Sequence, residues 1–480
     1  MTAEALETKN PCIHCTLHCR SLPAPVDLQA LSLALADRRS PSILGANVSV
    51  KEAGRFSYWA AEPREVFEFR PGSSDPLGQL EDLLGKYRLC DSPTGQRSLP
   101  DGMFRGGWIG WFGYELGRYI ERLPQTATDD LAMPLIHLRF YDRLLAYDHQ
   151  DPTFWLVALE LPDDTESPED KMAVLEQWLS ASQSIRPPHP RHANIEHIDL
   201  SKTRGNMAKA DYLRAVDRIK RYIRDGDVYQ VNFSQRFARP FTGRAIDLFH
   251  WQNCHNPSPY AAYLDAGSFQ IVSASPEMFV TVRNGLIQTK PIKGTRRRLP
   301  PDGPGQEANR RNLQDLLTNE KEQAELNMII DLERNDIARI CRPGTRRVVQ
   351  PRTIETYPTV FHAVATVAGQ LRSDVSFADI LKAVFPGGSI TGAPKIRAME
   401  IIDELEPTAR GVYTGSIGFI GLDGTVCLNI AIRTVIIAAH QAFVQTGGGI
   451  VADSDPEAEW EETITKARAL LAGIEAVQQP

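Results

Sequence analysis

Two pairs of glutamates, each separated by one helical turn, are the side chains of this sequence best suited to hold a metal ion. Glu459 and Glu462 stand at positions i and i+3 of a segment with helical spacing, and Glu322 and Glu325 repeat this pattern earlier in the chain. On a helix of 3.6 residues per turn such pairs share one face. A hard cation such as Mg²⁺ prefers oxygen ligands and commonly takes one or two carboxylates together with substrate oxygens. The spacing therefore predicts two helices that clamp one Mg²⁺. The alternative is that both faces are solvated and paired with lysines.

Lys293 is a candidate nucleophile. It follows a strand-like pattern in the run TKPIKGTRRR, residues 289–298, and precedes Gly294 and Thr295. A lysine attacks only when its amine is neutral, and desolvation or neighbouring cations favour that form by lowering the pKa of the amine. We expect Lys293 on a short rigid turn. The alternative is the common one for a single lysine, which is solvent-exposed and inert.

Two glycine-rich segments are candidates for binding an anion or a small ligand. The sequence FPGGSITGAPK spans residues 385–395 and precedes a predicted helix, while TGGGIVAD spans residues 446–453. Backbone N–H groups at a helix start attract anions, and glycine allows close approach of the backbone to a ligand. The first segment is not a nucleotide phosphate loop, because Ala393 follows Gly392 where a lysine would be needed. For both segments the alternative is a tight turn.

Three cysteines lie near the start of the sequence. Cys12, Cys15 and Cys19 are interleaved with His14 and His18. This spacing imitates a zinc knuckle, but no second ligand pair follows at zinc-finger spacing, so these cysteines receive no assigned role. Seven cysteines in 480 residues are a sparse and odd set. Such usage is typical of a reducing cytoplasm rather than of a disulfide scaffold.

Composition excludes two classes of partner. Acidic residues outnumber basic ones by 60 to 53, which gives a formal net charge of −7. A nucleic-acid-binding chain usually has a basic excess or a basic stripe, and this chain has neither. There is no run of about 18 apolar residues that could cross a membrane. The start of the chain lacks a secretory pattern. We therefore expect a cytoplasmic protein without a nucleic-acid or membrane partner.

The candidate site residues must be positioned by helices and strands, which the spacing of apolar residues in the sequence predicts. Helical spacing after residue 208 predicts a helix that ends at Gly226. Further helices are predicted over residues 318–334, 394–405 and 457–473. Strands are predicted over residues 260–292 and 411–450, with turns at Asn284-Gly285 and Asp423-Gly424. Residues 1–160 suggest short strands. The polar, proline-rich stretch at 161–207 contains a short helix over 170–179 and marks a boundary. We thus divide the chain into an N-terminal region (1–160), a connecting segment (161–207) and a catalytic domain (208–474).

In this order, the segments resemble the chorismate-utilising enzyme family over most of residues 208–474. The matching motifs are GDVYQVNFS at 226–234, SASPE at 273–277, PIKGT at 291–295, KEQAE at 321–325, DLERND at 331–336, PGGSITGAPK at 386–395 and GGGIVADSDP at 447–456. Residues 1–160 are similar to the N-terminal part of component I of anthranilate and aminodeoxychorismate synthases, through YWAAEP at 58–63 and GGWIGWFGY at 106–114. The resemblance implies an α+β fold in which two antiparallel sheets pack face to face with helices outside. The N-terminal region would add strands to that fold, so the boundary at 161–207 becomes a connection within one unit.

Two positions separate the activities within this family. Isochorismate and salicylate synthases typically have a water-activating lysine where this chain has Gln230, so the resemblance implies ammonia as the nucleophile. Anthranilate synthases usually have alanine where this chain has Lys293, whereas aminodeoxychorismate synthases commonly have lysine there. The resemblance therefore implies component I of an aminodeoxychorismate synthase, which makes 4-amino-4-deoxychorismate for 4-aminobenzoate and folate synthesis. The alternative is component I of an anthranilate synthase, which serves tryptophan synthesis.

The resemblance also implies roles for individual residues. Lys293 would attack chorismate, Glu277 would protonate the departing 4-hydroxyl, and His362 would hydrogen-bond that hydroxyl. Mg²⁺ would be held by Glu325 and Glu462 directly, and by Glu322 and Glu459 directly or through water. The implied substrate-binding set comprises Gln230, Gly294, Thr295, Tyr413, Arg433, Gly447, Gly448, Gly449 and Lys466.

Two further expectations concern an ammonia source and a regulatory ligand. The sequence contains no Gly-x-Cys-x-Gly glutaminase segment, so a separate glutamine amidotransferase subunit is expected to supply ammonia. Many relatives bind tryptophan through a Leu-Leu-Glu-Ser-like segment, where this chain reads ILGA at 43–46. The partner segment with Pro257, Ser258 and Pro259 is present, so tryptophan binding there stays open.

Overall fold

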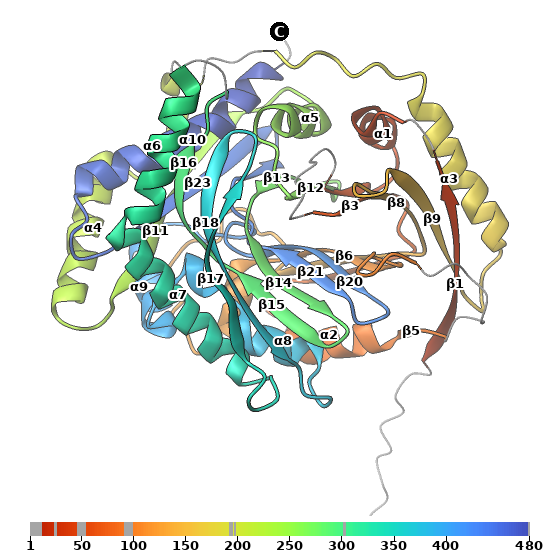
Figure 1. The fold of residues 1–480 in the computed structure, drawn as a ribbon, viewed down its shortest axis with the longest axis horizontal. Helices are drawn as coiled ribbons and strands as arrows, with labels where there is room; N and C mark the ends of the chain where they lie inside the picture. The colour runs from red at the N-terminus through yellow and green to blue at the C-terminus, as the bar shows by residue number, and fades with distance from the viewer. Residues whose placement is uncertain are drawn as a thin grey trace, which may run out of the picture.

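Two large β-sheets packed face to face form the centre of the molecule, and helices cover their outer surfaces (Figure 1). The structure is a computed structural model. It describes residues 12–23, 26–45, 54–90, 99–191, 195, 198–300 and 304–478. The expected α+β class with two sheets is confirmed.

The N-terminal region contributes nine strands within the described residues. The elements up to residue 182 are β1 (Ile13–Leu22), α1 (Leu28–Leu35), β2 (Ser42–Leu44), β3 (Phe56–Ala60), β4 (Glu65–Phe69), α2 (Pro76–Gly85), β5 (Tyr87–Leu89), β6 (Gly107–Phe112), the 3₁₀ helix η1 (Tyr114–Tyr119), β7 (Ile136–Tyr141), β8 (Arg143–Asp148), β9 (Thr153–Glu160) and α3 (Pro168–Ser182).

The middle of the chain alternates strands with four helices in the described residues. These elements are the 3₁₀ turn η3 (Leu200–Lys202), β10 (Arg204–Gly205), α4 (Lys209–Arg224), β11 (Gln230–Pro240), α5 (Ala245–His255), β12 (Tyr260–Asp265), β13 (Gln270–Ser275), β14 (Met278–Arg283), β15 (Leu286–Lys290), β16 (Ile292–Arg297), α6 (Pro304–Thr318) and α7 (Glu320–Ala338).

The last part of the chain returns to both sheets. Its elements are β17 (Arg347–Thr356), β18 (Val360–Gln370), α8 (Phe377–Val384), the 3₁₀ turn η4 (Gly388–Ile390), β19 (Gly392–Ala393), α9 (Lys395–Leu405), β20 (Ser416–Gly421), β21 (Val426–Asn429), β22 (Thr434–Ala438), β23 (Gln441–Ile450) and α10 (Pro456–Ala476).

Each sheet mixes strands from the two ends of the chain. The larger sheet has the order β10-β11-β23-β22-β13-β12-β2-β3-β8-β9-β1-β5, with β19 beside β11. The smaller sheet has the order β16-β18-β15-β14-β21-β20-β6-β7-β4, with β17 beside β18. The expectation of purely antiparallel sheets needs one correction, because β1 and β5 pair in parallel. A parallel pair needs a long crossover, and the chain between β1 and β5 supplies one.

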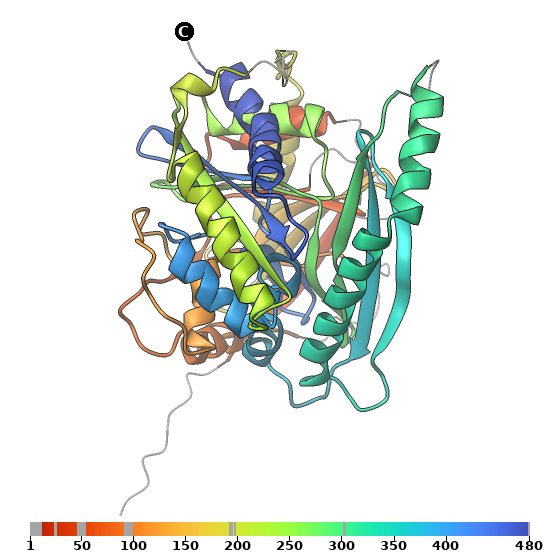
Figure 2. The ribbon, with the colours of Figure 1, turned by 90° about the vertical axis from the view of Figure 1, so that its left-hand side faces the viewer.

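Aromatic side chains fill the space between the two sheets. The Tyr58 ring on β3 meets the Phe419 ring on β20 edge-on, with centroids 5.4 Å apart. Trp108 and Trp111 on β6 are fully buried. On the outer face of the larger sheet, α1, α3, α5 and α10 pack through residues such as Trp178 and Leu471. Figure 2 shows α6 and α7 along the opposite side, beside β16 and β18, and α4 next to α10.

Capping residues set the positions at which α7 and α10 begin. Asn319 caps α7 by accepting a hydrogen bond from the Glu322 amide at 2.9 Å. Asp455 caps α10 through the Ala458 amide at 2.9 Å, and Pro456 occupies the first turn, where its missing N–H is not needed. These two helices therefore start where the sequence predicts, within a few residues, although both run several residues beyond the predicted ends. The predicted hairpin turn is confirmed at Asn284 and Gly285, both of which have positive φ between β14 and β15.

All seven cysteines lie among the described residues and are free thiols. Cys15 and Cys19 lie on β1, and no group of three or more His, Cys, Asp or Glu side chains in the described residues is arranged to hold a metal ion. Of the helices in the described ranges, none combines the length and the apolar character that crossing a membrane requires.

Candidate active site

A cavity of about 840 Å³ opens between α7, α10 and the strands that carry the sequence motifs. Nearly all the residues implied for catalysis, metal binding and substrate binding line this one cavity. They are Glu277, Lys293, Gly294, Thr295, Glu322, Glu325, His362, Tyr413, Arg433, Gly447, Gly448, Gly449, Glu459, Glu462 and Lys466. A volume of this size is in the range of small-molecule sites.

Lys293 stands on a β-bulge, not on a turn as expected. Between Ile292 and Thr295, β16 has one more residue than the facing stretch of β18, where the partners are Val364 and His362. Gly294 takes the positive φ of 95° within the bulge, and a Cβ there would lie 2.7 Å from the Glu322 Oε2 atom. A bulge re-aims side chains, which explains why the Lys293 amine lines the cavity rather than following the strand alternation.

Burial controls the charge of Lys293 and of its neighbour Glu277. It lowers the pKa of Lys293, against the opposing effect of the Glu325 and Glu277 carboxylates. It also raises the pKa of Glu277, which a hydrogen bond with Ser389 and the charge of Lys293 partly offset. The Glu277 Oε1 atom is buried and has no hydrogen-bond partner among the described residues. Burial thus favours a protonated Glu277 next to a neutral Lys293 amine.

His362 is held as a neutral imidazole. Burial, with a smaller contribution from Arg433, lowers the pKa of His362 to about 3. Its Nδ1 atom lies 2.8 Å from the Thr295 hydroxyl, and its buried Nε2 atom has no partner among the described residues. The cavity therefore offers an uncharged ring nitrogen to a bound ligand.

Four carboxylates line the cavity from two helices, as the sequence spacing predicts. Glu322 and Glu459 lie in the first turns of α7 and α10, where the helix dipole stabilises negative charge. Arg296 donates to the Glu322 Oε1 atom at 2.8 Å, which leaves the buried Oε2 atom without a partner. Lys466 lies 2.7 Å from the Glu462 carboxylate and also donates to the Gly447 carbonyl oxygen at 2.8 Å.

The three glycines at 447–449 lie inside β23 and pair with β11, so the alternative of a turn after a strand is wrong. A Cβ on Gly448 would lie 3.1 Å from the Glu459 Oε2 atom and 3.7 Å from the Glu462 Oε1 atom. Glycine at this position therefore leaves the space between the strand and the two carboxylates clear. In the other glycine-rich segment, a Cβ on Gly388 would lie 2.4 Å from Leu332, which indicates close packing against α7.

Two groups of predicted site residues lie apart from the cavity wall. Gln230 is buried behind Gly449, since a Cβ on that glycine would lie 2.0 Å from the Gln230 Nε2 atom. Pro259 borders a separate cavity of about 920 Å³, together with Leu44 and Tyr58. The adjacent Pro257 and Ser258 do not line either cavity. Tryptophan binding at this segment stays a prediction, and Ala46 of the companion stretch lies outside the described residues.

Sequence reasoning missed several residues that border the cavity. Ser389 hydrogen-bonds Glu277, and its carbonyl oxygen accepts from the Lys293 amine at 3.4 Å. The segment that contains Ser389 was marked by its glycines, but nothing distinguished the serine. Arg296 belongs to the run TKPIKGTRRR, residues 289–298, in which only Lys293, Gly294 and Thr295 were predicted to have a role. Arg410 stands alone in the sequence, and no local pattern could have identified it.

Comparisons with known proteins agree with this geometry. The model of the chorismate binding enzyme family matches residues 36–472. Aminodeoxychorismate synthase component 1 from Bacillus subtilis is 40% identical, covering 91% of this chain and 90% of that protein. Anthranilate synthase component 1 from Pseudomonas putida is also 40% identical, covering 84% of this chain and 81% of that protein. Identity alone therefore does not separate the two reactions.

Solved structures give the same fold. The crystal structure of anthranilate synthase component I from Streptococcus pneumoniae superposes with a TM-score of 0.72 at 33% identity, covering 87% of this chain and 92% of that one. The menaquinone-specific isochorismate synthase from Escherichia coli gives a TM-score of 0.70 at 17% identity, covering 96% of this chain and 95% of that one. At this identity the similarity shows a shared fold and nothing more. Since the family model matches nearly the whole chain and the cavity gathers the motifs of that family, the protein belongs to the chorismate-binding enzymes.

Proposed function

We propose that this protein is component I of an aminodeoxychorismate synthase, which converts chorismate and ammonia to 4-amino-4-deoxychorismate. The observation that carries the proposal is the Lys293 amine, which lines the cavity close to Glu277 and has a pKa lowered by burial. Alanine usually stands at this position in anthranilate synthases. A lysine there would provide a nucleophile that those enzymes lack.

Two positive side chains in the cavity would bind the two carboxylates of chorismate. Arg433 and Lys466 both line the cavity, and the backbone of Gly447–Gly449 adds hydrogen-bonding groups next to them. Charge-assisted hydrogen bonds to a carboxylate are stronger than neutral ones. Tyr413, which also lines the cavity, would add its hydroxyl to these groups. Chorismate would then lie with its ring above Lys293.

The first chemical step would be an attack of the neutral Lys293 amine on C2 of the ring. The C2–N bond forms, both ring double bonds shift (C1–C2 to C1–C6, and C5–C6 to C4–C5), and the C4–O bond breaks. Glu277 would give its proton to the departing hydroxyl, which leaves as water, and the amine would lose a proton to the same carboxylate. The neutral His362 ring would hydrogen-bond the 4-hydroxyl through its unpartnered Nε2 atom. General acid catalysis of this kind contributes about 10²–10⁴-fold to a rate.

The second step would be the attack of ammonia on C4. The C4–N bond forms, both ring double bonds shift back, and the C2–N bond to Lys293 breaks. The added nitrogen loses a proton and the departing lysine nitrogen gains one, so that the lysine is released as an amine. The product is 4-amino-4-deoxychorismate, a precursor of 4-aminobenzoate in folate synthesis. The ammonia would come from a separate glutamine amidotransferase subunit, since the sequence contains no glutaminase nucleophile segment.

The four glutamates fit Mg²⁺ in the chemistry of their donors. Each offers carboxylate oxygens to the same cavity, and the Glu322 Oε2 atom is buried without a partner. Glu325 and Glu462, with Glu322 and Glu459, would hold the ion after Arg296 and Lys466 release the carboxylates that they now contact. Bound there, Mg²⁺ would polarise the ring carboxylate of chorismate and offset its charge.

The second candidate is component I of an anthranilate synthase. Its support is the equal identity of relatives that carry this name. In that reaction ammonia adds at C2 and pyruvate leaves. The two candidates therefore differ in the position of the amine and in the loss of pyruvate.

Mass spectrometry of the products distinguishes the candidates. Purified protein is incubated with chorismate, Mg²⁺ and an ammonium salt at mildly alkaline pH, with and without a lyase that converts aminodeoxychorismate to 4-aminobenzoate. A product of aminodeoxychorismate mass that the lyase turns into 4-aminobenzoate supports the proposal. Anthranilate formed without the lyase would assign the second candidate instead.

A further inference from the structure

Glu115 is a buried carboxylate from the N-terminal region that the proposed mechanism does not use. It follows the motif GGWIGWFGY directly, as the second residue of η1, and only 8% of its surface is exposed. It does not line the chorismate cavity. A buried charged group destabilises the fold unless it is paired or hydrogen-bonded, so the partners of Glu115 indicate what it holds in place.

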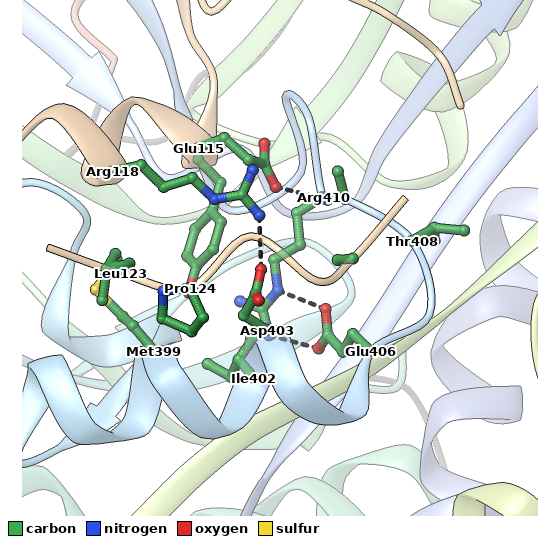
Figure 3. A pocket seen from close by; sticks show the side chains of 13 residues that line it. Glu115, Arg118, Leu123, Pro124, Met399, Ile402, Asp403, Glu406, Thr408 and Arg410 are labelled. Carbon is green, nitrogen blue, oxygen red and sulfur yellow. Dashed lines mark hydrogen bonds and ion pairs between the residues drawn. The ribbon is translucent and has the colours of Figure 1, made fainter. Parts of the chain in front are cut away.

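Both carboxylate oxygens of Glu115 accept hydrogen bonds from the backbone of a turn at residues 410–414. The Arg410 amide donates to the Oε1 atom at 2.7 Å, as a dashed line in Figure 3 marks, and the Gly411 amide donates to the Oε2 atom at 2.9 Å. The Tyr114 amide donates in the opposite direction, to the Gly411 carbonyl oxygen at 2.7 Å. Burial raises the pKa of Glu115, and the hydrogen bonds from the turn and the charge of Arg118 oppose that rise. Two consecutive residues of the N-terminal region therefore hold the turn through three hydrogen bonds.

The turn carries Tyr413, whose side chain lines the chorismate cavity. The Tyr413 amide donates to the Arg410 carbonyl oxygen at 3.2 Å. The Arg410 guanidinium lies 4.7 Å from the centre of the Tyr114 ring and 5.8 Å from the centre of the Tyr413 ring. Glu406 fixes this guanidinium through hydrogen bonds of 2.6 and 2.8 Å, which Figure 3 also marks. Contacts of Glu115 with the turn are thus contacts with the support of Tyr413.

The backbone of the turn needs this support. Gly411 has a φ of 61° and Thr414 has a φ of 58°. Glycine adopts this left-handed conformation readily, but for a β-branched threonine it is unfavourable. The Thr414 hydroxyl accepts a hydrogen bond from the Arg410 guanidinium at 3.2 Å. A strained conformation persists only where its surroundings hold it, so loss of the Glu115 contacts should let the turn relax and move Tyr413.

We propose that Glu115 is a positioning residue for chorismate binding, because it holds the turn at residues 410–414 in the conformation that places Tyr413 in the cavity wall. The inference rests on the proposed function, in which Tyr413 is one of the groups that bind chorismate. Glu115 does not touch the substrate, so its effect passes through the turn. The motif GGWIGWFGY, which ends at Tyr114, thereby gains a part in a site that lies in another region of the chain.

Glu115→Gln disturbs the turn while keeping the shape of the side chain. The new amide group can accept from only one of the two backbone amides and presents its own N–H₂ group to the other. We expect the KM for chorismate, measured as chorismate consumption with saturating ammonium salt and Mg²⁺, to rise about 10-fold or more, with little change in kcat. The matched control is Asp403→Asn, which makes the same change at an equally buried carboxylate of the small pocket in Figure 3. Asp403 bonds to Arg118 and Thr126 and not to the turn, so its variant should keep the wild-type KM.

A double-mutant cycle shows whether the effect of Glu115 passes through Tyr413. Tyr413→Phe removes only the hydroxyl group, and we expect it to raise the KM for chorismate as well. If Glu115 positions that hydroxyl, then Glu115→Gln should change the KM by less than about 2-fold in the Tyr413→Phe background, because coupled residues are not additive. The midpoint of urea unfolding shows that the single and double variants are folded.

Other results would contradict the inference. A wild-type KM in folded Glu115→Gln would show that Tyr413 does not depend on this carboxylate. Independent, multiplying effects in the double variant would assign Glu115 to another group, and an equal rise in Asp403→Asn would indicate a general loosening of the pocket. If Glu115→Gln does not fold, Glu115→Asp decides in its place, because its shorter carboxylate stays ionised but cannot reach both amides.

Failure of the proposed function is distinguishable, because chorismate is the substrate of both candidate reactions. Anthranilate as the product would overturn the proposed function and leave the role of Glu115 to be decided by the same KM values. Wild-type protein that consumes no chorismate would overturn both.

Discussion

Lys293 and Glu277 meet at Ser389. The Lys293 amine donates to the Ser389 carbonyl oxygen at 3.4 Å, and the Ser389 side chain is hydrogen-bonded with the Glu277 carboxyl group. Each charge stabilises the other, so their mutual attraction favours the ionised pair. Burial opposes the ionised pair at both ends, because it lowers the pKa of the amine and raises the pKa of the acid. The arrangement therefore favours a free amine and a proton donor side by side.

Replacing Lys293 tests whether its amine takes part in the reaction. We expect Lys293→Met, which keeps the length of the side chain but lacks the amine, to lower the kcat for C4 amination by about 10²–10⁴-fold, in line with the loss of one catalytic group. Coupled 4-aminobenzoate formation measures the rate. The midpoint of urea unfolding is the control, and it should not fall, because a buried amine is replaced by an apolar group. A variant that still aminates C4 at full rate would exclude the covalent step.

Glu277→Gln separates the proton donor from its position. The amide keeps the shape of the side chain but cannot release a proton, so we expect kcat to fall by about 10²–10⁴-fold while the KM for chorismate changes little. The matched control is Glu457→Gln, an exposed position in the first turn of α10 that does not line the cavity. An unchanged kcat for Glu277→Gln would assign the proton transfer to another group.

A second buried acid gives a pH-dependent stability. Burial, with the nearby charges of Glu277 and Asp336, raises the pKa of Glu333 from 4.5 to about 8, although Thr289 donates a hydrogen bond to its carboxylate. The folded protein then holds this proton more tightly than the unfolded chain does. The stability that Glu333 contributes is complete below pH 4.5 and is lost as the pH rises from 4.5 to 8, by at most about 1.4 kcal/mol per pH unit.

Glu333→Gln should remove that dependence. We expect the free energy of unfolding of the variant, measured with urea at pH 5.5 and 7.5, to fall less between the two values than that of wild type. Glu320→Gln, at an exposed position on the same helix, should keep the wild-type difference. Identical differences in wild type and Glu333→Gln would show that Glu333 titrates near its ordinary value.

A methyl group at Gly448 should obstruct the carboxylates. In Gly448→Ala the new Cβ would lie 3.1 Å from the Glu459 carboxylate, and the backbone there has no positive φ that alanine would resist. We therefore expect a folded protein in which the Mg²⁺ concentration for half-maximal rate and the KM for chorismate both rise at least 10-fold. Gly85→Ala, at the exposed last position of α2, provides the control for a glycine outside the cavity, since its φ is not positive and a Cβ there would meet nothing within 4 Å. Unchanged constants in Gly448→Ala would place the ion and the substrate away from this strand.

The helices α7 and α10 were predictable from the sequence, because the residues that determine them lie within a few positions of one another. The glutamate pairs on α7 and α10 and the caps that start these helices follow from spacing and residue type within a few positions. The bulge at Lys293 was not predictable, because it depends on the register between β16 and β18, whose residues are far apart in the sequence. The same holds for Arg410, whose importance comes from contacts with residues such as Asn232 and Glu115 in other parts of the chain.

Strand β6 pairs with one strand from the N-terminal part of the chain and with one from the C-terminal part, and this affects how the chain folds during translation. All six of its residues are buried, and it pairs with β7 on one edge and with β20 on the other. The first partner follows almost at once, but the second does not exist until residue 421 has been made. At roughly 5–20 residues per second, a ribosome leaves that apolar edge open for about 15–60 seconds. An unpaired strand edge is a template for aggregation. Protection of the nascent chain during this interval would therefore govern the yield of folded enzyme.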